Sequence, residues 1–350
     1  VQSFMAKAKK LPSGNWRCRA YLGEDANGKK IMKSFTASTK KEAEFLASQY
    51  LIENHSEGED QTFLQVYNKM IELKRPAISP GTYREFVRDI QNDYYDMVKN
   101  IPVIKIDNAL VQKMINTWIT KGLSPKTISN KYVNFRSAMR TVYKNIDYDV
   151  IRPEKEPANI YIPTDEEVKI LVNASKNTPV EVAILLGAYM GMREAEIAAL
   201  RWDNVDLQKR LMTVSEATSI DVNNNTVIKK PKSVSGNRTL PIPEIVCEAL
   251  QRHRNDNKEL VVPLSCAAIY KRFKRILHST GIHDFRFHDL RHYYASVMLS
   301  LSVPDKYAME RMGHSTNSTL KNVYQHTMKN KQDEISAQLD AYFSSPTNEK

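Results

Sequence analysis

His288 and His292 stand four residues apart in His-Asp-Leu-Arg-His, a spacing that on a helix lets two imidazoles share one metal ion. Two features disfavour a metal site. The residue after the first histidine is Asp289 rather than the glutamate base of a metalloprotease, and no obvious third ligand is nearby. The chain also lacks a glycine-rich loop ending in Gly-Lys-Ser/Thr, a Cys-x-x-Cys pair and a Gly-x-Ser-x-Gly motif. These absences disfavour ATP-driven and serine-hydrolase chemistry.

Five short motifs follow one another in the C-terminal half of the chain. They are Gly191-Met192-Arg193-Glu194-Ala195-Glu196, Lys232 ahead of Ser235-Gly236-Asn237-Arg238-Thr239-Leu240-Pro241, His288-Asp289-Leu290-Arg291, Met312-Gly313-His314-Ser315 and Val323-Tyr324-Gln325-His326. In this order and at these separations they resemble the motifs of the tyrosine recombinases, in particular phage and conjugative-transposon integrases. The resemblance covers the whole catalytic half.

The resemblance implies that DNA strands are cut and rejoined, and it assigns the residues that hold the phosphate. Attack on a phosphodiester builds negative charge on its non-bridging oxygens, and two planar, permanently charged guanidiniums suit that charge. Arg193 and Arg291 take this role, and His314 is expected to donate to the same oxygens. Glu196 is expected to orient Arg193 or His288 rather than to transfer protons.

The resemblance makes Tyr324 the nucleophile. A tyrosine has a reference pKa of about 10, so its proton must be removed during attack. His288 is the expected base, and Lys232 on a hairpin is the expected acid for the departing 5′ oxygen. Lys229 and Lys230 stand close to Lys232 and are the alternatives for that role.

Three positions depart from the common pattern of the family. Met190 stands where a threonine commonly precedes the glycine, Met312 replaces the usual leucine, and Tyr293 replaces a frequent threonine. None of them removes a functional group from the proposed chemistry. Tyr293 and Tyr294 directly follow the His-x-x-Arg motif on the same helix, where we expect packing rather than nucleophilic attack.

The segment expected to position these residues, about 160–343, predicts a mixed α+β catalytic domain. Thr164-Asp165-Glu166-Glu167 is a capping box that opens a helix, and helical stretches continue to about Arg201. Strands are predicted at 211–214, 226–229 and 238–241. Helices are predicted again from Pro243 to the C-terminus.

Two further segments precede it. A polar linker at 53–61 and a charged, proline-containing linker at 152–157 bound a four-helix module at about 60–150, with helices predicted at 62–74, 79–98, 107–121 and 124–145. Residues 1–56 predict strands at 15–20 and 31–36 around the Asn27-Gly28 hairpin, then a helix at 40–51. We therefore predict a multidomain, mainly α protein with an N-terminal three-stranded sheet plus helix.

The formal charge of +11 favours a polyanionic partner. Residues 1–45 hold ten Lys or Arg against four Asp or Glu, so a basic outer face is predicted there; a merely solvated face is the alternative. Hydrophobic residues make up 41% of the chain, and no apolar run approaches the roughly 18 residues of a membrane span. The three scattered cysteines and the lack of a secretory leader favour a reducing cytoplasm.

The resemblance also implies the partners. The first is double-stranded DNA, whose core sites are bound by the helical and catalytic domains and whose arm-type sites are bound by the N-terminal sheet. The others are further copies of the chain, in a homotetramer on two duplexes, and DNA-bending accessory proteins. A bacterial cytoplasm, at the nucleoid, is the expected location. No cofactor is expected, because the phosphotyrosine conserves the bond energy.

Three alternatives remain open from the residues alone. A type IB topoisomerase shares the arginines, lysine, histidine and tyrosine; a DNA-binding regulator with a vestigial site and a metal-dependent nuclease are more remote. The tail offers a further choice, because Ile335, Leu339 and Tyr342 recur at helical spacing. In this family such a helix docks on a neighbouring protomer, and the alternative is that it packs on its own domain.

Overall fold

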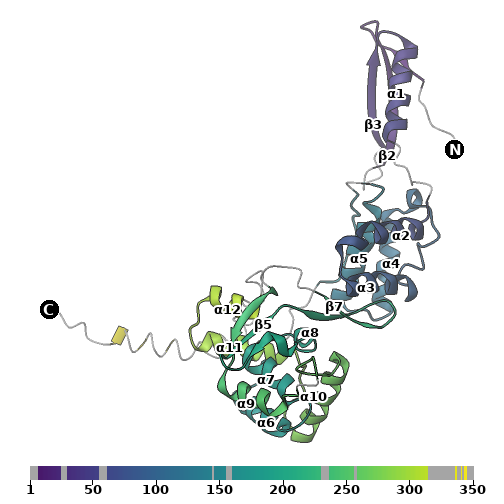
Figure 1. Cartoon of the computed structure of the whole chain (residues 1–350). Coiled ribbons are helices and arrows are strands. Elements are labelled where there is room, and N and C mark those ends of the chain that lie inside the picture. Colours follow the sequence, from purple (N-terminus) through teal and green to yellow (C-terminus); the bar gives the residue numbers. More distant parts are fainter. Residues whose placement is uncertain are drawn as a thin grey trace. The chain divides into compact units, whose positions relative to one another are not determined.

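The chain forms two compact units, residues 1–157 and 158–350. No described helix is long and apolar enough to cross a membrane. The predicted multidomain, mainly α architecture is confirmed (Figure 1). The computed structural model describes residues 7–24, 30–54, 61–143, 146–154, 160–229, 236–255 and 258–313, together with positions 336, 340, 343 and 344.

An antiparallel sheet covered by one helix forms the start of the first unit. Its elements are β1 (Lys9–Lys10), β2 (Trp16–Glu24), β3 (Lys30–Ala37) and α1 (Lys40–Asn54), with the strands paired in the order β1-β2-β3.

Small side chains make the contact between α1 and the sheet. Ala43 and Ala47 of the helix are buried in one cluster with Cys18 and Ala20 of β2. Trp16 and Phe35 border this cluster. Leu46 of the same helix is 38% exposed, because alanine contacts leave only a narrow strip of the helix against the sheet.

Four α-helices occupy the described residues of 61–154. They are α2 (Phe63–Lys74), α3 (Pro80–Gln91), α4 (Asn108–Thr120) and α5 (Pro125–Met139), with 3-10 turns η1 (Arg75–Ala77) and η2 (Val103–Lys105). Ser79 and Ser124 cap α3 and α5, since each side chain accepts a hydrogen bond from the backbone N–H of the third helical residue.

Two of these helices end before the predicted residue. The helix predicted at 79–98 ends at Gln91, because Asp93 adopts φ +52°, which a helix interior does not contain. Tyr95 and Val98 beyond it are still buried, so the apolar pattern continued where the helix did not. The helix predicted at 124–145 ends at Met139, and Val142 beyond it is buried.

An aromatic core with one polar network holds the helical module together. Phe63, Tyr67, Tyr95 and Phe135 have neighbouring rings with centroids 5.0–6.5 Å apart. Asp89 is fully buried among them; it accepts from Tyr67 Oη at 3.1 Å and Asn134 Nδ2 at 2.9 Å and pairs with Lys131. The buried charge is therefore satisfied.

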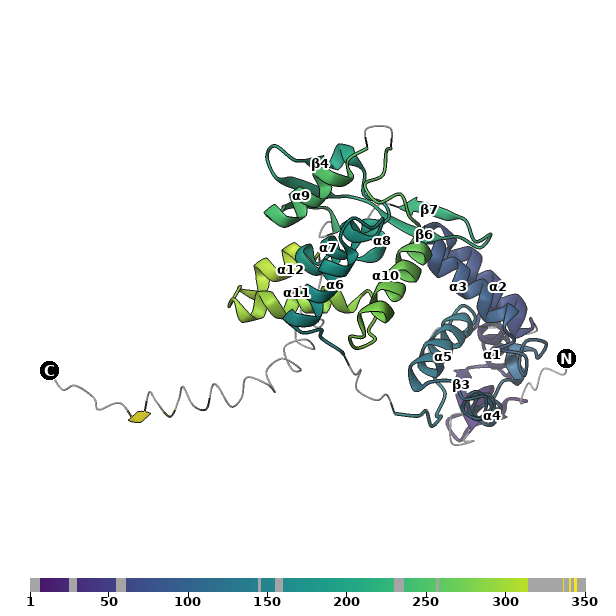
Figure 2. The same cartoon turned by 90° about the horizontal axis from the view of Figure 1, so that it is seen from below.

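In the second unit, α7 (Glu181–Met190) is the central helix. It contacts α6 (Asp165–Ser175), α8 (Glu194–Ile197), α9 (Glu244–His253) and α11 (Asp289–Ser300), as Figures 1 and 2 show. Nearly all of its side chains are buried, which is typical of a helix enclosed by others. The remaining helices are η3 (Trp202–Asn204), α10 (Cys266–Thr280) and α12 (Asp305–Met312).

Two small sheets complete this unit. Strands β4 (Val205–Asp206), β5 (Leu211–Val214) and β8 (Arg238–Pro241) form one antiparallel sheet, and β6 (Ala217–Ile220) pairs with β7 (Thr226–Lys229) in a separate ribbon. The three predicted strands are confirmed. The short strands β4 and β6 were not predicted. The helical stretches predicted from Thr164 to about Arg201 are α6, α7 and α8, and the last of them ends at Ile197.

Candidate active site

Gly191 shapes the turn that presents Arg193. The glycine ends α7 with φ +62°, and a Cβ atom at this position would lie 2.4 Å from Cδ1 of Tyr294. Only glycine meets both conditions. The turn places Arg193 at the start of α8, where its backbone N–H donates to Glu196 Oε2 at 3.0 Å.

The guanidinium of Arg193 has two protein partners. Nη1 donates to Glu196 Oε1 at 2.6 Å, and Nη2 donates to the carbonyl of Gly313 at 2.9 Å. The side chain is still 37% exposed. Its open face is therefore available to an anion.

Glu196 is a buried carboxylate held between two arginines. Burial alone would raise its pKa, but hydrogen bonds and charge from Arg238, with the charge of Arg193, lower that pKa to about 2. It is thus ionised at neutral pH. An acid with this pKa orients guanidiniums and does not shuttle protons.

Arg291 is almost completely buried, with 2% of its surface exposed. It donates to the carbonyls of Gly191 and Met312. Burial and the charge of nearby Arg193 lower its pKa to about 9. It is still charged at neutral pH, and an incoming phosphate would relieve the repulsion between the two guanidiniums.

His288 immediately precedes α11, one turn from Arg291. Desolvation, then the charges of His292 and Arg291, lower its pKa to about 4. Its ring is perpendicular to that of His292 with centroids 5.0 Å apart, and the residue is exposed. A neutral imidazole with an open side can accept a proton. Among the described residues, no group of three His, Cys, Asp or Glu could hold a metal ion.

Arg193, His288 and Arg291 are thus brought into one cluster with Glu196. Lys232, His314 and Tyr324 lie outside the described residues, as does most of the predicted tail helix. Lys232 falls between β7 and β8, and His314 directly follows Gly313, whose carbonyl accepts from Arg193.

Sequence reasoning assigned no role to Arg238. The structure places it on Glu196, with Nη2 2.8 Å from Oε2 and its side chain 3% exposed. The available signal was its position in Ser235-Gly236-Asn237-Arg238-Thr239-Leu240-Pro241, the stretch that also follows Lys232.

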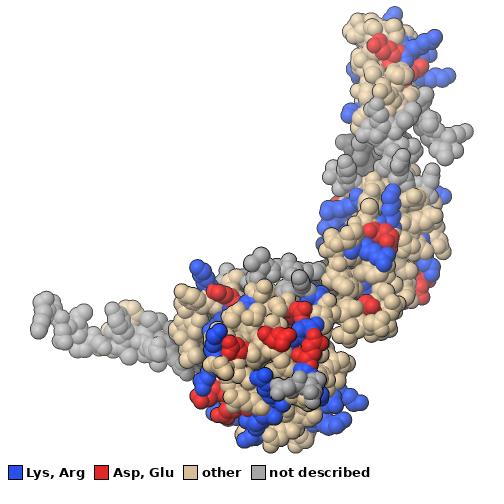
Figure 3. Space-filling model, in the orientation of Figure 1, with Lys and Arg blue, Asp and Glu red and all other residues tan. Residues whose placement is uncertain are grey.

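The distribution of surface charge says less about function than the residues of the site do. On the face drawn in Figure 3, Lys and Arg side chains are interspersed with Asp and Glu over both units. The net charge of +11 is therefore not gathered into one patch in this view.

Comparison with known proteins identifies related chains. Residues 162–331 match the family model "Phage integrase family". A "Tyrosine recombinase XerC-like" protein of Caldanaerobacter subterraneus is 28% identical over 365 residues, covering 89% of this chain and 92% of its own length. The ICEBs1 integrase of Bacillus subtilis is 21% identical over 95% of this chain and 98% of its own length.

Solved structures share the fold. The integrase of the Tn1549 transposon, in complex with transposon right end DNA, superposes with a TM-score of 0.67 at 19% identity, covering 79% of this chain and 100% of that chain. A lambda integrase dimer bound to a core site gives a TM-score of 0.57 at 15% identity, covering 91% and 94%.

Proposed function

The chain belongs to the phage integrase family of tyrosine recombinases, and we propose that it integrates and excises a mobile element through a 3′-phosphotyrosine on Tyr324. Tyr324 Oη attacks the scissile phosphorus, and the bond from phosphorus to the 5′ oxygen breaks. Attack by a 5′ hydroxyl of the partner strand reverses these steps and releases the tyrosine. The number of phosphoester bonds is unchanged, so rejoining needs no external energy source.

The observation that carries this proposal is the pairing of Arg193 with Arg291 around the turn at Gly191. Both guanidiniums donate hydrogen bonds to backbone carbonyls, and Arg193 also contacts Glu196. Their positions are thereby fixed before any substrate arrives. Preorganised donors of this kind stabilise the charge that develops on a phosphate during attack.

The remaining roles follow from chemistry and the family resemblance. His288, neutral at pH 7 with its pKa lowered to about 4, accepts the proton of Tyr324. Lys232 protonates the departing 5′ oxygen. His314 donates to a non-bridging oxygen beside the two arginines.

The partners follow from the relatives. The Tn1549 relative was solved with its transposon DNA, and lambda integrase was solved as a tetramer on a Holliday junction. This chain binds double-stranded DNA and exchanges strands as a homotetramer on two duplexes, with arm-type sites bound by residues 1–56. It works in the bacterial cytoplasm at the nucleoid, where its substrate lies, with the help of DNA-bending accessory proteins.

A two-site recombination assay tests the proposal. Wild-type protein is expected to join plasmids that carry the attachment sites of its element, and the Tyr324→Phe variant is expected to give no product while still binding DNA. Tyr270→Phe, on the exposed side of α10, is the matched control and should recombine normally.

A topoisomerase would instead relax a supercoiled plasmid that carries no attachment sites. If this relaxation is as fast as on a site-containing plasmid, the protein is a topoisomerase and the proposal fails. The relatives named above are recombinases and integrases, so this alternative is not favoured.

A further inference from the structure

Three successive carbonyls at the C-terminal end of α12 each accept from a different arginine. Arg238 Nε donates to the carbonyl of Arg311 at 2.8 Å, Arg291 donates to that of Met312, and Arg193 donates to that of Gly313 at 2.9 Å. The last carbonyls of a helix lack intrahelical partners and carry partial negative charge. The helix end therefore docks on a triangle of guanidiniums.

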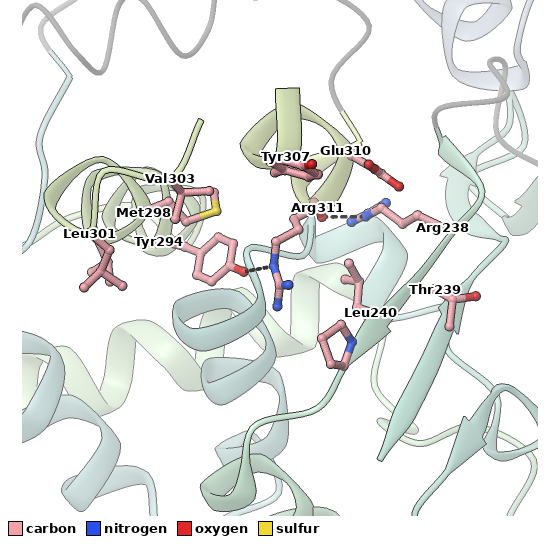
Figure 4. Close-up of a pocket in the computed structure, with 12 residues that line it drawn as sticks. Arg238, Thr239, Leu240, Tyr294, Met298, Leu301, Val303, Tyr307, Glu310 and Arg311 are labelled. Atoms are coloured by element: carbon pink, nitrogen blue, oxygen red, sulfur yellow. Dashed lines mark hydrogen bonds between the residues drawn. The ribbon is translucent and has the colours of Figure 1, made fainter. Parts of the chain in front are cut away.

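Arg238 differs from the other two arginines because all three of its guanidinium nitrogens donate to protein groups. Besides Arg311, it forms two bonds with Glu196, at 2.8 Å from Nη2 and 3.3 Å from Nη1. Figure 4 shows its side chain extending from β8 toward the carbonyl of Arg311 on α12. With 3% of the side chain exposed, Arg238 has no open face for a phosphate.

The contacts of Arg238 lead to Arg193 and to the segment before His314, the two residues proposed to hold the phosphate beside Arg291. Glu196 Oε1, which accepts from Arg238, also accepts from Arg193 Nη1 at 2.6 Å. The carbonyl that accepts from Arg238 lies three residues before His314. One buried side chain thus connects β8, α8 and the end of α12.

We propose that Arg238 is a positioning residue for the proposed reaction. It fixes the position of the Arg193 guanidinium through Glu196, and it holds the end of α12, which His314 follows in the chain. Without Arg238, Arg193 is the one cation still hydrogen-bonded to the buried Glu196 carboxylate among the described residues. The carboxylate would draw the Arg193 guanidinium away from the phosphate. The inference rests on the proposed function, because its effect appears in strand cleavage.

Arginine is required here rather than any cation. Its planar fork can meet a carboxylate with two nitrogens while the third donates elsewhere, whereas a lysine presents one ammonium on a flexible stem. Arg238→Lys should therefore retain the ion pair with Glu196 and lose the bond to the Arg311 carbonyl. Arg238→Met should lose both.

Single-turnover cleavage of a suicide substrate, with DNA affinity measured separately, gives the first test. Arg238→Met should cleave about 10²-fold more slowly than wild type, as expected for a misplaced catalytic group, with DNA affinity within about threefold. Arg238→Lys should fall between the two. Arg252→Met is the matched control: Arg252 pairs with the buried Glu181 of α7 in the same unit, and its loss should change stability but not cleavage.

A methylphosphonate at the scissile position separates positioning from a purely structural role. Its methyl group replaces one charged oxygen, so less charge needs to be held by Arg193. The defects of Arg193→Ala and Arg238→Met should both shrink at least tenfold on this substrate. All rates are measured well below the melting temperature of each variant, and Arg238→Lys decides the matter if Arg238→Met does not fold.

Two results would overturn the inference while leaving the proposed function intact. One is wild-type cleavage rates in both Arg238 variants; the other is an Arg238 defect of equal size on phosphate and methylphosphonate. Absence of cleavage by the wild-type protein on its own sites would instead count against the proposed function.

Discussion

Glu194 follows Arg193 in the chain, yet its Oε1 atom is buried without a hydrogen-bond partner among the described residues. Burial raises the pKa of Glu194 to about 7, against about 4.3 in an unfolded chain. Between these values the folded protein holds a proton that the unfolded chain has released. The free energy of unfolding must therefore fall as the pH rises through this window.

Substitution of Glu194 by glutamine tests this sign. The side chain at position 194 does not titrate in Glu194→Gln. The free energy of unfolding of this variant, relative to wild type, should therefore be higher at pH 8 than at pH 5 by about 1–3 kcal/mol. Thermal or denaturant unfolding at both pH values measures it. Glu248→Gln, at an exposed position of α9, is the control, and an equal Glu194→Gln effect at both pH values would refute the account.

The role of Lys232 as the acid can be tested by changing the leaving group. Lys232→Ala should cleave ordinary DNA poorly but recover on a 5′-bridging phosphorothiolate, because sulfur departs without a proton. The matched variants Lys229→Ala and Lys230→Ala should need no such rescue. Rescue confined to one of these two would move the acid to that lysine.

Short motifs predicted part of the site because each carries its chemistry within a few residues. Arg193, His288 and Arg291 were chosen from such motifs, and the structure brings them into one cluster. Arg238 was missed because its partners, Glu196 and the Arg311 carbonyl, are 42 and 73 residues away in the chain. Contacts of that range follow from the fold and leave no local pattern.

At the scale of elements, strands bounded by turn residues were predictable, as β5, β7 and β8 demonstrate. Helix ends were harder to predict where buried side chains continue beyond the last helical residue. Tyr95 and Val98 are core residues in a turn, and burial alone does not distinguish a turn from a helix. The brief strand β6 lacks a clear alternation, since its residues are half-buried or exposed.

The N-terminal sheet and helix have a small core of their own, built from Cys18, Ala20, Ala43 and Ala47. The buried residues of the helical module form a separate cluster. Deletion of residues 1–56 should therefore leave cleavage at core sites within about threefold of wild type, while binding to arm-type sites and full recombination are lost. Gel-shift and recombination assays measure both; undiminished recombination would make the segment a solvated basic appendage.

At the scale of the whole molecule, assembly is expected to depend on the tail. Deletion of residues 333–350 should give a folded protein that binds core-site DNA as a monomer but forms few synaptic tetramers, because a helix this short needs a surface to dock on. Sizing of the complexes by light scattering measures this. A tailless protein that still forms tetramers with wild-type recombination yield would show that the tail acts within its own subunit.

Identification of the residue that becomes linked to DNA tests the central claim most directly. Adduct trapped on a suicide substrate is digested with trypsin, and the DNA-linked peptide is identified by mass spectrometry. Cleavage after Lys321 and Lys329 gives a peptide in which Tyr324 is the only tyrosine. The account predicts that this peptide carries the 3′-phosphate; an adduct on a peptide containing Tyr293 and Tyr294, or on a residue other than tyrosine, would contradict it.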